Sequence, residues 1–108
     1  MSILAIIVNR TDTVQAYQNV HRHLRDSGNL PPAGLVFQVA ASADPGYQVI
    51  TVWDSLASFS RFRDELLRPA LQAEGIPPEN LTTTTFEVTS YVAGDLAAAA
   101  QQPAPATT

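Results

Sequence analysis

The hydrophobic pattern of the first third of the chain predicts a strand followed by a helix. Residues Ile3 to Val8 are continuously apolar and rich in β-branched side chains, which is typical of a strand covered on both faces. Thr11 or Asp12 then caps a helix that is expected to run to about Ser27. Spacings of three and four place one set of side chains on a single face of that helix: Val14, Tyr17, His21 and Leu24, with Val20 beside them.

Two further apolar segments, Leu35 to Ala41 and Tyr47 to Trp53, predict a β-hairpin. The turn Ala43-Asp44-Pro45-Gly46 joins them, since proline fixes φ and glycine permits a positive φ. Alternation places Tyr47, Val49, Thr51 and Trp53 on one face of the third strand, opposite Ile50 and Val52. In the second strand it groups Leu35, Phe37 and Val39 against Val36, Gln38 and Ala40.

A second amphipathic helix follows, capped by Asp54-Ser55. Proline inside a helix removes a backbone donor, so a bend is expected at Pro69. Glu65 lies four and three residues from Arg61 and Arg68, which predicts a solvated salt-bridge face. The apolar stripe of this helix consists of Leu56, Phe59, Phe62, Leu66 and Ala70. Thr82 to Val92 is the fourth predicted strand.

The order β-α-β-β-α-β predicts an α+β, ferredoxin-like fold, with an antiparallel sheet and both helices on one face. The strands are nevertheless apolar on both faces. An open sheet face of this kind would expose a patch of several hundred Å², which monomers seldom carry. We therefore expect a homodimer in which two protomers pack sheet to sheet. Residues 1–93 form this single domain, and residues 94–108 form a tail rich in Ala, Pro and Thr.

Composition removes several classes of chemistry. The 108 residues include no cysteine and no lysine, so thiol catalysis, zinc–thiolate sites and Schiff-base chemistry are excluded. Two histidines at i and i+2, His21 and His23, diverge on a helix, and the acids are dispersed; we therefore expect no metal and no cofactor.

The six arginines are scattered and the net charge is −4, so neither nucleic acid nor a membrane is an expected partner. The apolar opening lacks a basic region and a cleavage site, and a cytoplasmic protein is expected.

The segment GYQVITVWDSLASFSRFRDELLRPAL at positions 46–71 resembles the dimeric α+β barrel superfamily, most closely the antibiotic-biosynthesis-monooxygenase-like branch and its bacterial relatives. The resemblance is carried by Val52-Trp53-Asp54-Ser55, by Phe59 and Phe62, and by Leu67-Arg68-Pro69-Ala70-Leu71. It implies a dimeric α+β barrel, formed by two protomers, with a pocket between sheet and helices in each. This fold hosts many activities, so the resemblance predicts the fold better than the function.

Relatives within the superfamily suggest two kinds of activity. Heme-degrading members carry an asparagine on the first strand and a tryptophan and an iron-ligating histidine on the second helix. Phe62 and Gln72 stand at those helix positions here, so heme cleavage is not expected. Cofactor-free oxygenase members place Trp, Asn, Tyr and Arg side chains around an aromatic substrate. Trp53, Asn9 and Tyr17 are the counterparts that the resemblance offers.

His21 is the candidate catalytic residue, because a neutral imidazole on an apolar helix face can accept a proton from a bound phenol or carbon acid. Burial and Arg25 are expected to keep it neutral, and the competing interpretation is a histidine bonded to a backbone carbonyl at the edge of the core. The predicted ligand-binding residues are Tyr17, Trp53, Phe59, Phe62 and Asn9, with core packing as the alternative for the aromatic ones.

The function predicted from these observations is a small homodimeric pocket protein that binds a hydrophobic or aromatic small molecule. Its activity as an enzyme would be a cofactor-free monooxygenation or cyclisation. The alternative is a non-catalytic dimeric binding or accessory module whose pocket is filled by its own side chains. A cavity of a few hundred Å³ that reaches His21 would favour the first, and a filled pocket the second.

Overall fold

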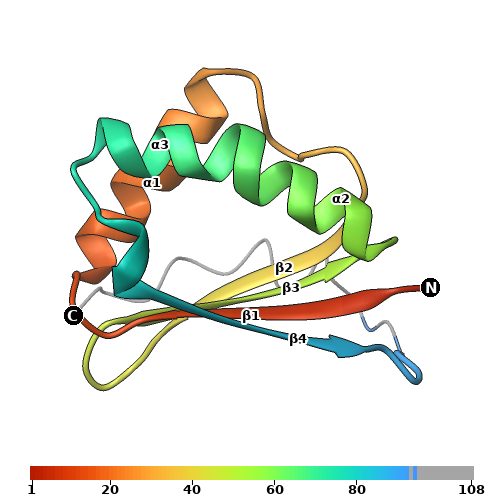
Figure 1. Ribbon diagram of the computed structural model, residues 1–108. Helices are drawn as coiled ribbons and strands as arrows, with labels where there is room; N and C mark the ends of the chain where they lie inside the picture. The colour runs from red at the N-terminus through yellow and green to blue at the C-terminus, as the bar shows by residue number, and fades with distance from the viewer. Residues whose placement is uncertain (93, 95–108) are drawn as a thin grey trace.

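The computed structural model describes residues 1–92 and Gly94 (Figure 1). The predicted order of elements is present. The elements are β1 (Ile3–Asn9), α1 (Val14–Asp26), β2 (Leu35–Ser42), β3 (Tyr47–Trp53), α2 (Leu56–Arg61), the π-helix η1 (Phe62–Leu67), α3 (Arg68–Ala73), the 3-10 helix η2 (Pro78–Asn80) and β4 (Leu81–Glu87).

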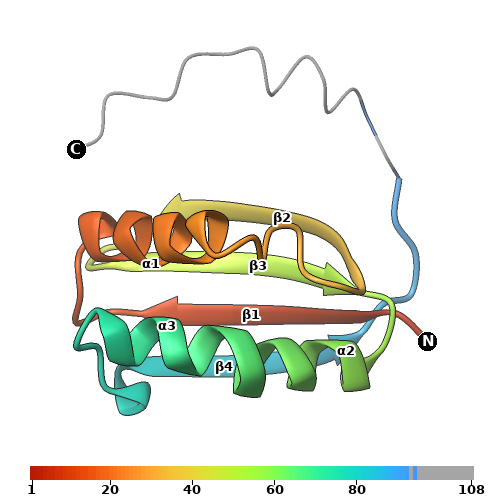
Figure 2. The ribbon, with the colours of Figure 1, turned by 90° about the horizontal axis from the view of Figure 1, so that it is seen from above.

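The four strands form one antiparallel sheet in the order β2-β3-β1-β4. The helices α1, α2 and α3 all lie on one side of this sheet (Figure 1). Seen from the helix side, α1 lies over β2 and β3, while α2 and α3 run over β1 and β4 (Figure 2). The α+β, ferredoxin-like fold predicted from the sequence is confirmed.

The core lies between the two central strands and the helices. Every second residue of β3, from Tyr47 to Trp53, is buried, and Ala5 and Ile7 of β1 are buried on the same face. Val20 and Leu24 of α1 and Phe59, Phe62, Ala70 and Leu71 of the second helical segment complete this core. The helix face and the alternation in β3 predicted from the sequence are therefore confirmed.

The opposite face of the sheet is apolar and carries no helix among the described residues. Val39, Phe37 and Phe86 are exposed on its outer strands, and Ile50 and Val52 of β3 are half-buried there. Leu4 pairs with Phe86 and Ile6 pairs with Ile50, so the apolar surface continues across β1. This is the open face that the sequence predicts.

The predicted alternation in β2 is confirmed from Phe37 to Ala40 but is wrong for Leu35, because a bulge separates Leu35 from Phe37. Leu35 pairs with Trp53 and Phe37 pairs with Val52, so one extra β2 residue stands opposite a single step of β3. Leu35 therefore shares the helix-covered face with Gln38 and Ala40. Phe37 and Val39 belong to the open face.

One correction concerns the N-terminus of α1. Thr13, rather than Thr11 or Asp12, is its N-cap, and the Thr13 hydroxyl accepts a hydrogen bond from the Ala16 amide at 3.2 Å. Asp12 is engaged elsewhere, because its carboxylate accepts hydrogen bonds from Asn9 and from Asn80. The predicted cap of α2 is confirmed at Ser55, which accepts from the Ser58 amide at 3.1 Å.

Pro69 lies in the first turn of α3, directly after the π-helical segment η1. The Arg68 amide bonds to the Arg63 carbonyl, five residues earlier, instead of four. Widening the turn before Pro69 relieves the clash between the proline ring and the preceding turn. The ribbon continues as one helix from α2 through α3 (Figure 1). The effect of Pro69 is therefore a π-helical segment within a longer helix.

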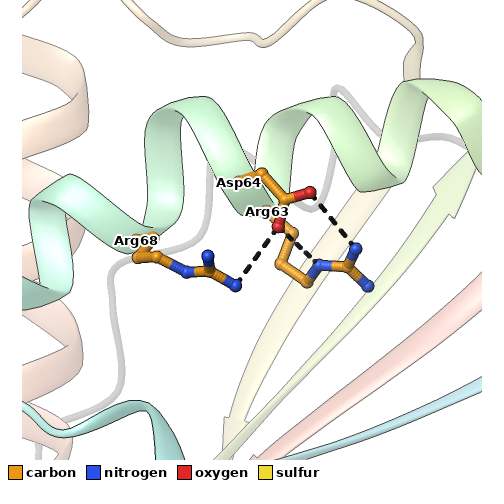
Figure 3. A network of polar contacts seen from close by, with 3 residues as sticks. All are labelled: Arg63, Asp64 and Arg68. Atoms are coloured by element: carbon orange, nitrogen blue, oxygen red, sulfur yellow. Dashed lines mark hydrogen bonds and ion pairs between the residues drawn. The ribbon is translucent and has the colours of Figure 1, made fainter.

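The exposed ion pairs of this helix centre on Asp64 rather than on Glu65. Arg63 Nε lies 3.0 Å and Arg68 Nη2 3.3 Å from Asp64 Oδ1 (Figure 3). The hydrogen bond from Arg63 is the main reason that the pKa of Asp64 is lowered. A charge cluster of this kind on a solvated helix face adds little stability.

β4 ends at Glu87, earlier than the Val92 expected from the sequence. The division into a domain at residues 1–93 and a tail at residues 94–108 stays a prediction, because positions 93 and 95–108 lie outside the described residues. In the described part of the chain, no helix has the length and apolar character needed to cross a bilayer.

Candidate functional site

A small apolar cavity lies between α1, the sheet and the η1–α3 segment. Its volume is about 50 Å³, enough for a few water molecules. Most of its wall is aliphatic or aromatic, and it includes Val20, Leu24, Val49, Phe62 and Leu71. We call this the inner cavity. Its polar lining comes from Tyr17, His21, Gln38, Tyr47 and Thr51.

Three of these polar side chains form a hydrogen-bonded chain from β2 to α1. Gln38 Nε2 donates to the Tyr17 hydroxyl at 3.3 Å, and this hydroxyl lies 3.4 Å from Nδ1 of His21. Tyr17 and His21 are one helical turn apart, with ring centroids 5.7 Å from each other. Which of the two donates follows from the tautomer of His21. We call this set the Gln38–Tyr17–His21 chain.

The electrostatics of this chain keep both ring groups neutral near pH 7. Burial lowers the pKa of His21, and the positive charge of Arg25 lowers it further. Burial raises the pKa of the Tyr17 hydroxyl, and the hydrogen bond from Gln38 only partly opposes that change. The sequence-based expectation of a neutral, partly buried His21 is confirmed.

Nε2 of His21 makes no hydrogen bond to any described residue. Nδ1 faces Tyr17, and no backbone carbonyl bonds to the ring within the described part of the chain. The described residues also contain no buried side-chain nitrogen or oxygen without a partner, so Nε2 is reached by solvent. One ring nitrogen is thus oriented by the protein, and the other is available to a ligand.

An open groove of about 520 Å³ lies outside the inner cavity, between α1, β2 and the loop that joins them. We call it the outer groove. It shares Tyr17, His21, Leu30 and Gln38 with the inner cavity. The Gln38–Tyr17–His21 chain therefore forms part of the boundary between the two spaces. The remaining lining residues of the groove are Arg25, Pro31, Leu35 and Ala40.

Of the six site residues predicted from the sequence, the structure brings Tyr17, His21 and Phe62 together around the inner cavity. Trp53 and Phe59 are buried in the core but do not line it. The Trp53 ring packs 5.8 Å from Phe59 and 5.1 Å from Phe62, and its Nε1 donates to Thr51 Oγ1 at 2.8 Å. Trp53 supports the wall of the site from behind.

Asn9, the sixth predicted residue, is fully buried at the end of β1. Its Nδ2 donates to Asp12 Oδ2 at 2.8 Å and to the Tyr47 hydroxyl at 3.1 Å. Its Oδ1 accepts from the amides of Thr11 and Asp12, each at 2.9 Å. These contacts use both donors and both lone pairs of the side-chain amide. Asn9 fixes the β1–α1 turn and holds Tyr47 in place.

Gln38 and Tyr47 also belong to the site, although neither is among the six predicted site residues. No local feature of the sequence pairs Gln38 with Tyr17, because the β2 bulge that places Gln38 on the helix-covered face leaves no local signal. Tyr47 lines the inner cavity, and its ring packs 5.4 Å from that of Tyr17. The available signal for Gln38 was an amide within an otherwise apolar strand.

Among the described residues, no group of three or more histidine or acidic side chains is arranged to hold a metal ion. The site consists instead of neutral hydrogen-bonding groups on an apolar wall. Such a wall can bind an apolar molecule, orient one polar atom on it and exchange a proton with it.

No model of a known protein family matches the sequence, and no curated protein matches it. Solved structures do match the fold. SnoaB, a cofactor-independent oxygenase from Streptomyces nogalater, has a TM-score of 0.57 and 14% identity over 84% of this chain and 95% of that one. A dimeric ferredoxin-like protein from Thermobifida fusca has a TM-score of 0.56 and 20% identity over 82% and 92% of the two chains.

MhuD, in a variant with two manganese protoporphyrin IX groups bound per active site, has a TM-score of 0.59 and 16% identity over 85% of this chain and 99% of that one. At these identities the similarity establishes the fold alone. The resemblance of the sequence to the dimeric α+β barrel proteins is confirmed at that level.

Proposed function

We propose that this protein is a homodimer that binds a hydrophobic or aromatic small molecule beside α1. The observation that carries the proposal is the position of the Gln38–Tyr17–His21 chain, which lines both the apolar inner cavity and the outer groove. Isolated polar groups on an apolar wall are the usual means by which a pocket orients a ligand.

His21 is the proposed proton acceptor. In the tautomer that carries its proton on Nδ1, this N–H donates to the Tyr17 oxygen, which already accepts from Gln38. Nε2 then presents a lone pair, and it takes the proton of a bound phenol or carbon acid to give the imidazolium and the ligand anion. Tyr17 and Gln38 are positioning residues, since Tyr17 contacts Nδ1 of the ring and Gln38 hydrogen-bonds to Tyr17.

Proton abstraction of this kind is the first step that a cofactor-free oxygenation or cyclisation requires. The fold similarity to SnoaB, a cofactor-independent oxygenase, supports this activity class. The dimer is supported by the apolar open face of the sheet and by the dimeric ferredoxin-like neighbours. Three further points stay predictions. They are the cytoplasmic location, the absence of a tightly bound metal or cofactor, and ligand contacts by Trp53, Phe59 and Asn9.

The second candidate is a non-catalytic binding or accessory module. It is favoured by the size of the inner cavity, because about 50 Å³ is far smaller than an ordinary ligand pocket. In that case the outer groove alone accepts the ligand, and His21 only hydrogen-bonds to it.

Binding of 1-naphthol, an apolar ring system with one hydroxyl, tests the proposal by calorimetry and by oxygen uptake. Tyr17→Phe and His21→Gln should each weaken binding by about fivefold, the effect of one lost hydrogen bond. His23→Gln, on the solvated side of α1, is the matched control and should bind as the wild type does. Oxygen uptake that His21→Gln abolishes would identify an enzyme, and binding without uptake would favour the module. Binding that none of these substitutions changes would contradict the proposed site.

A further inference from the structure

The outer side of the site carries positive charge. A second hollow, of about 260 Å³, adjoins the outer groove along α1 and is lined by Tyr17, Gln18, His21, Arg22 and Arg25. Arg25 lines both of these open spaces. Among the described residues, no aspartate or glutamate lines either of them or the inner cavity. This local excess of cations lies in a chain whose net charge is −4.

Both arginines are available for a new partner. Arg25 Nε lies 3.2 Å from Asp26 Oδ1, but both side chains are more than 60% exposed, and an exposed pair of this kind is weak. Within the described part of the chain, Arg22 has no carboxylate within ion-pair distance. The two residues are three apart on α1, so they lie along the same edge of the helix.

The charge of Arg25 also acts on the site itself, since it contributes to the lowered pKa of His21. The guanidinium is therefore close enough for its field to reach the ring beside which the ligand is placed. An anionic group bound at Arg25 would share the open space that His21 also lines.

We infer that the ligand of this site is an amphiphilic anion, with its apolar body in the outer groove and a carboxylate, sulfonate or phosphate group at Arg22 and Arg25. Leu30, Pro31 and Leu35 supply the apolar wall, and the arginines supply charged hydrogen-bond donors suited to such a group. Two cations are too few for a nucleic-acid surface, which needs many phosphate contacts. This inference rests on the proposed function and specifies the class of its ligand.

Two fluorescent probes of similar shape separate the effect of charge from that of apolar contact. The first is 1-anilinonaphthalene-8-sulfonate, which is an anion, and the second is N-phenyl-1-naphthylamine, which is uncharged. The double substitution Arg22→Gln with Arg25→Gln should weaken binding of the sulfonate by about fivefold, a change typical of partly exposed charge pairs. Binding of the uncharged probe should stay within about twofold.

Arg61→Gln is the matched control, because it removes an exposed arginine that lines none of the three spaces. It should leave both affinities unchanged. Added salt should weaken binding of the sulfonate to the wild type and have little effect on the uncharged probe. Equal changes for both probes, or no change in the double variant, would overturn the inference.

Ala40→Trp distinguishes failure of the anionic-ligand inference from failure of the proposed function. The new side chain fills the outer groove from an exposed position on β2. Ala40→Leu serves the same purpose with a smaller side chain. Both should reduce binding of both probes. Loss of binding in these variants together with no effect of the arginines would leave the proposed site intact and reject the anionic ligand. Binding that neither Ala40 variant reduces would reject the site itself, and the inference with it.

Discussion

The polar residues Asn9 and His21 have different roles, and the difference lies in how many of their hydrogen-bonding atoms already have partners in the protein. Both amide hydrogens and both oxygen lone pairs of Asn9 form hydrogen bonds within the protein, so this residue stabilises a turn. In His21 only Nδ1 has a hydrogen-bond partner, and Nε2 has none among the described residues. A residue with capacity left over beside a hollow is the better candidate for ligand contact.

His21 should make stability depend on pH. Because burial and Arg25 lower its pKa in the folded state, the unfolded chain binds the proton more tightly. The stabilising contribution is fully present above the ordinary value of 6.5 and is lost as pH falls through the lower folded value. Urea unfolding of wild type and His21→Gln at several pH values measures this. On acidification, the free energy of unfolding of the wild type should fall relative to that of His21→Gln. A difference between the two proteins that does not depend on pH would contradict this assignment.

At the scale of elements, the site depends on how the β2–β3 turn meets the end of β1. Gly46 has φ +90°, and a Cβ built there would collide with the Asn9 carbonyl oxygen and the Arg10 backbone. The turn therefore packs against the segment in which Asn9 holds Tyr47. A glycine is required here for its conformation and for its lack of a side chain.

Gly46→Ala should lower the free energy of unfolding by at least about 2 kcal/mol, since strain at positive φ adds to a backbone clash. Gly28→Ala is the control, because Gly28 also has a positive φ, at 77°, but nothing lies within 4 Å of the added carbon. It should cost only about 1 kcal/mol, the conformational part alone. Thermal or urea denaturation compares the two, and equal losses would show that the close approach to Asn9 has no energetic weight.

At the scale of the whole molecule, the sheet has one face covered by helices and one apolar face without them in the described part of the chain. A second copy packed on that face would remove its apolar side chains from water, and a standard stable interface buries about 1,600 Å². The wild type should therefore be a dimer at micromolar concentration by light scattering. A monomeric wild type would contradict both the dimer and the reasoning from the open face.

Ile50→Asp places a charge near the middle of that face, on a central strand, and should produce a folded monomer because an unpaired charge is costly at a buried interface. Leu56→Asp is the matched control, since Leu56 is an exposed leucine on α2, on the other side of the sheet. It should stay dimeric. Light scattering and circular dichroism together measure assembly and folding.

The sequence by itself determined the order of elements, the buried face of α1 with His21 at its edge, and the alternation in β3, because burial repeats with the period of each element. Only the tertiary structure decided that Gln38 meets Tyr17, that Asn9 is saturated and that Trp53 and Phe59 lie behind the site. Those outcomes follow from contacts between residues distant in the chain, such as the 21 positions that separate Tyr17 from Gln38. The β2 bulge shows the reason most directly. One extra residue places Leu35 on the same face as Gln38, which strict alternation would not do, and this shift is defined by the pairing of β2 with β3.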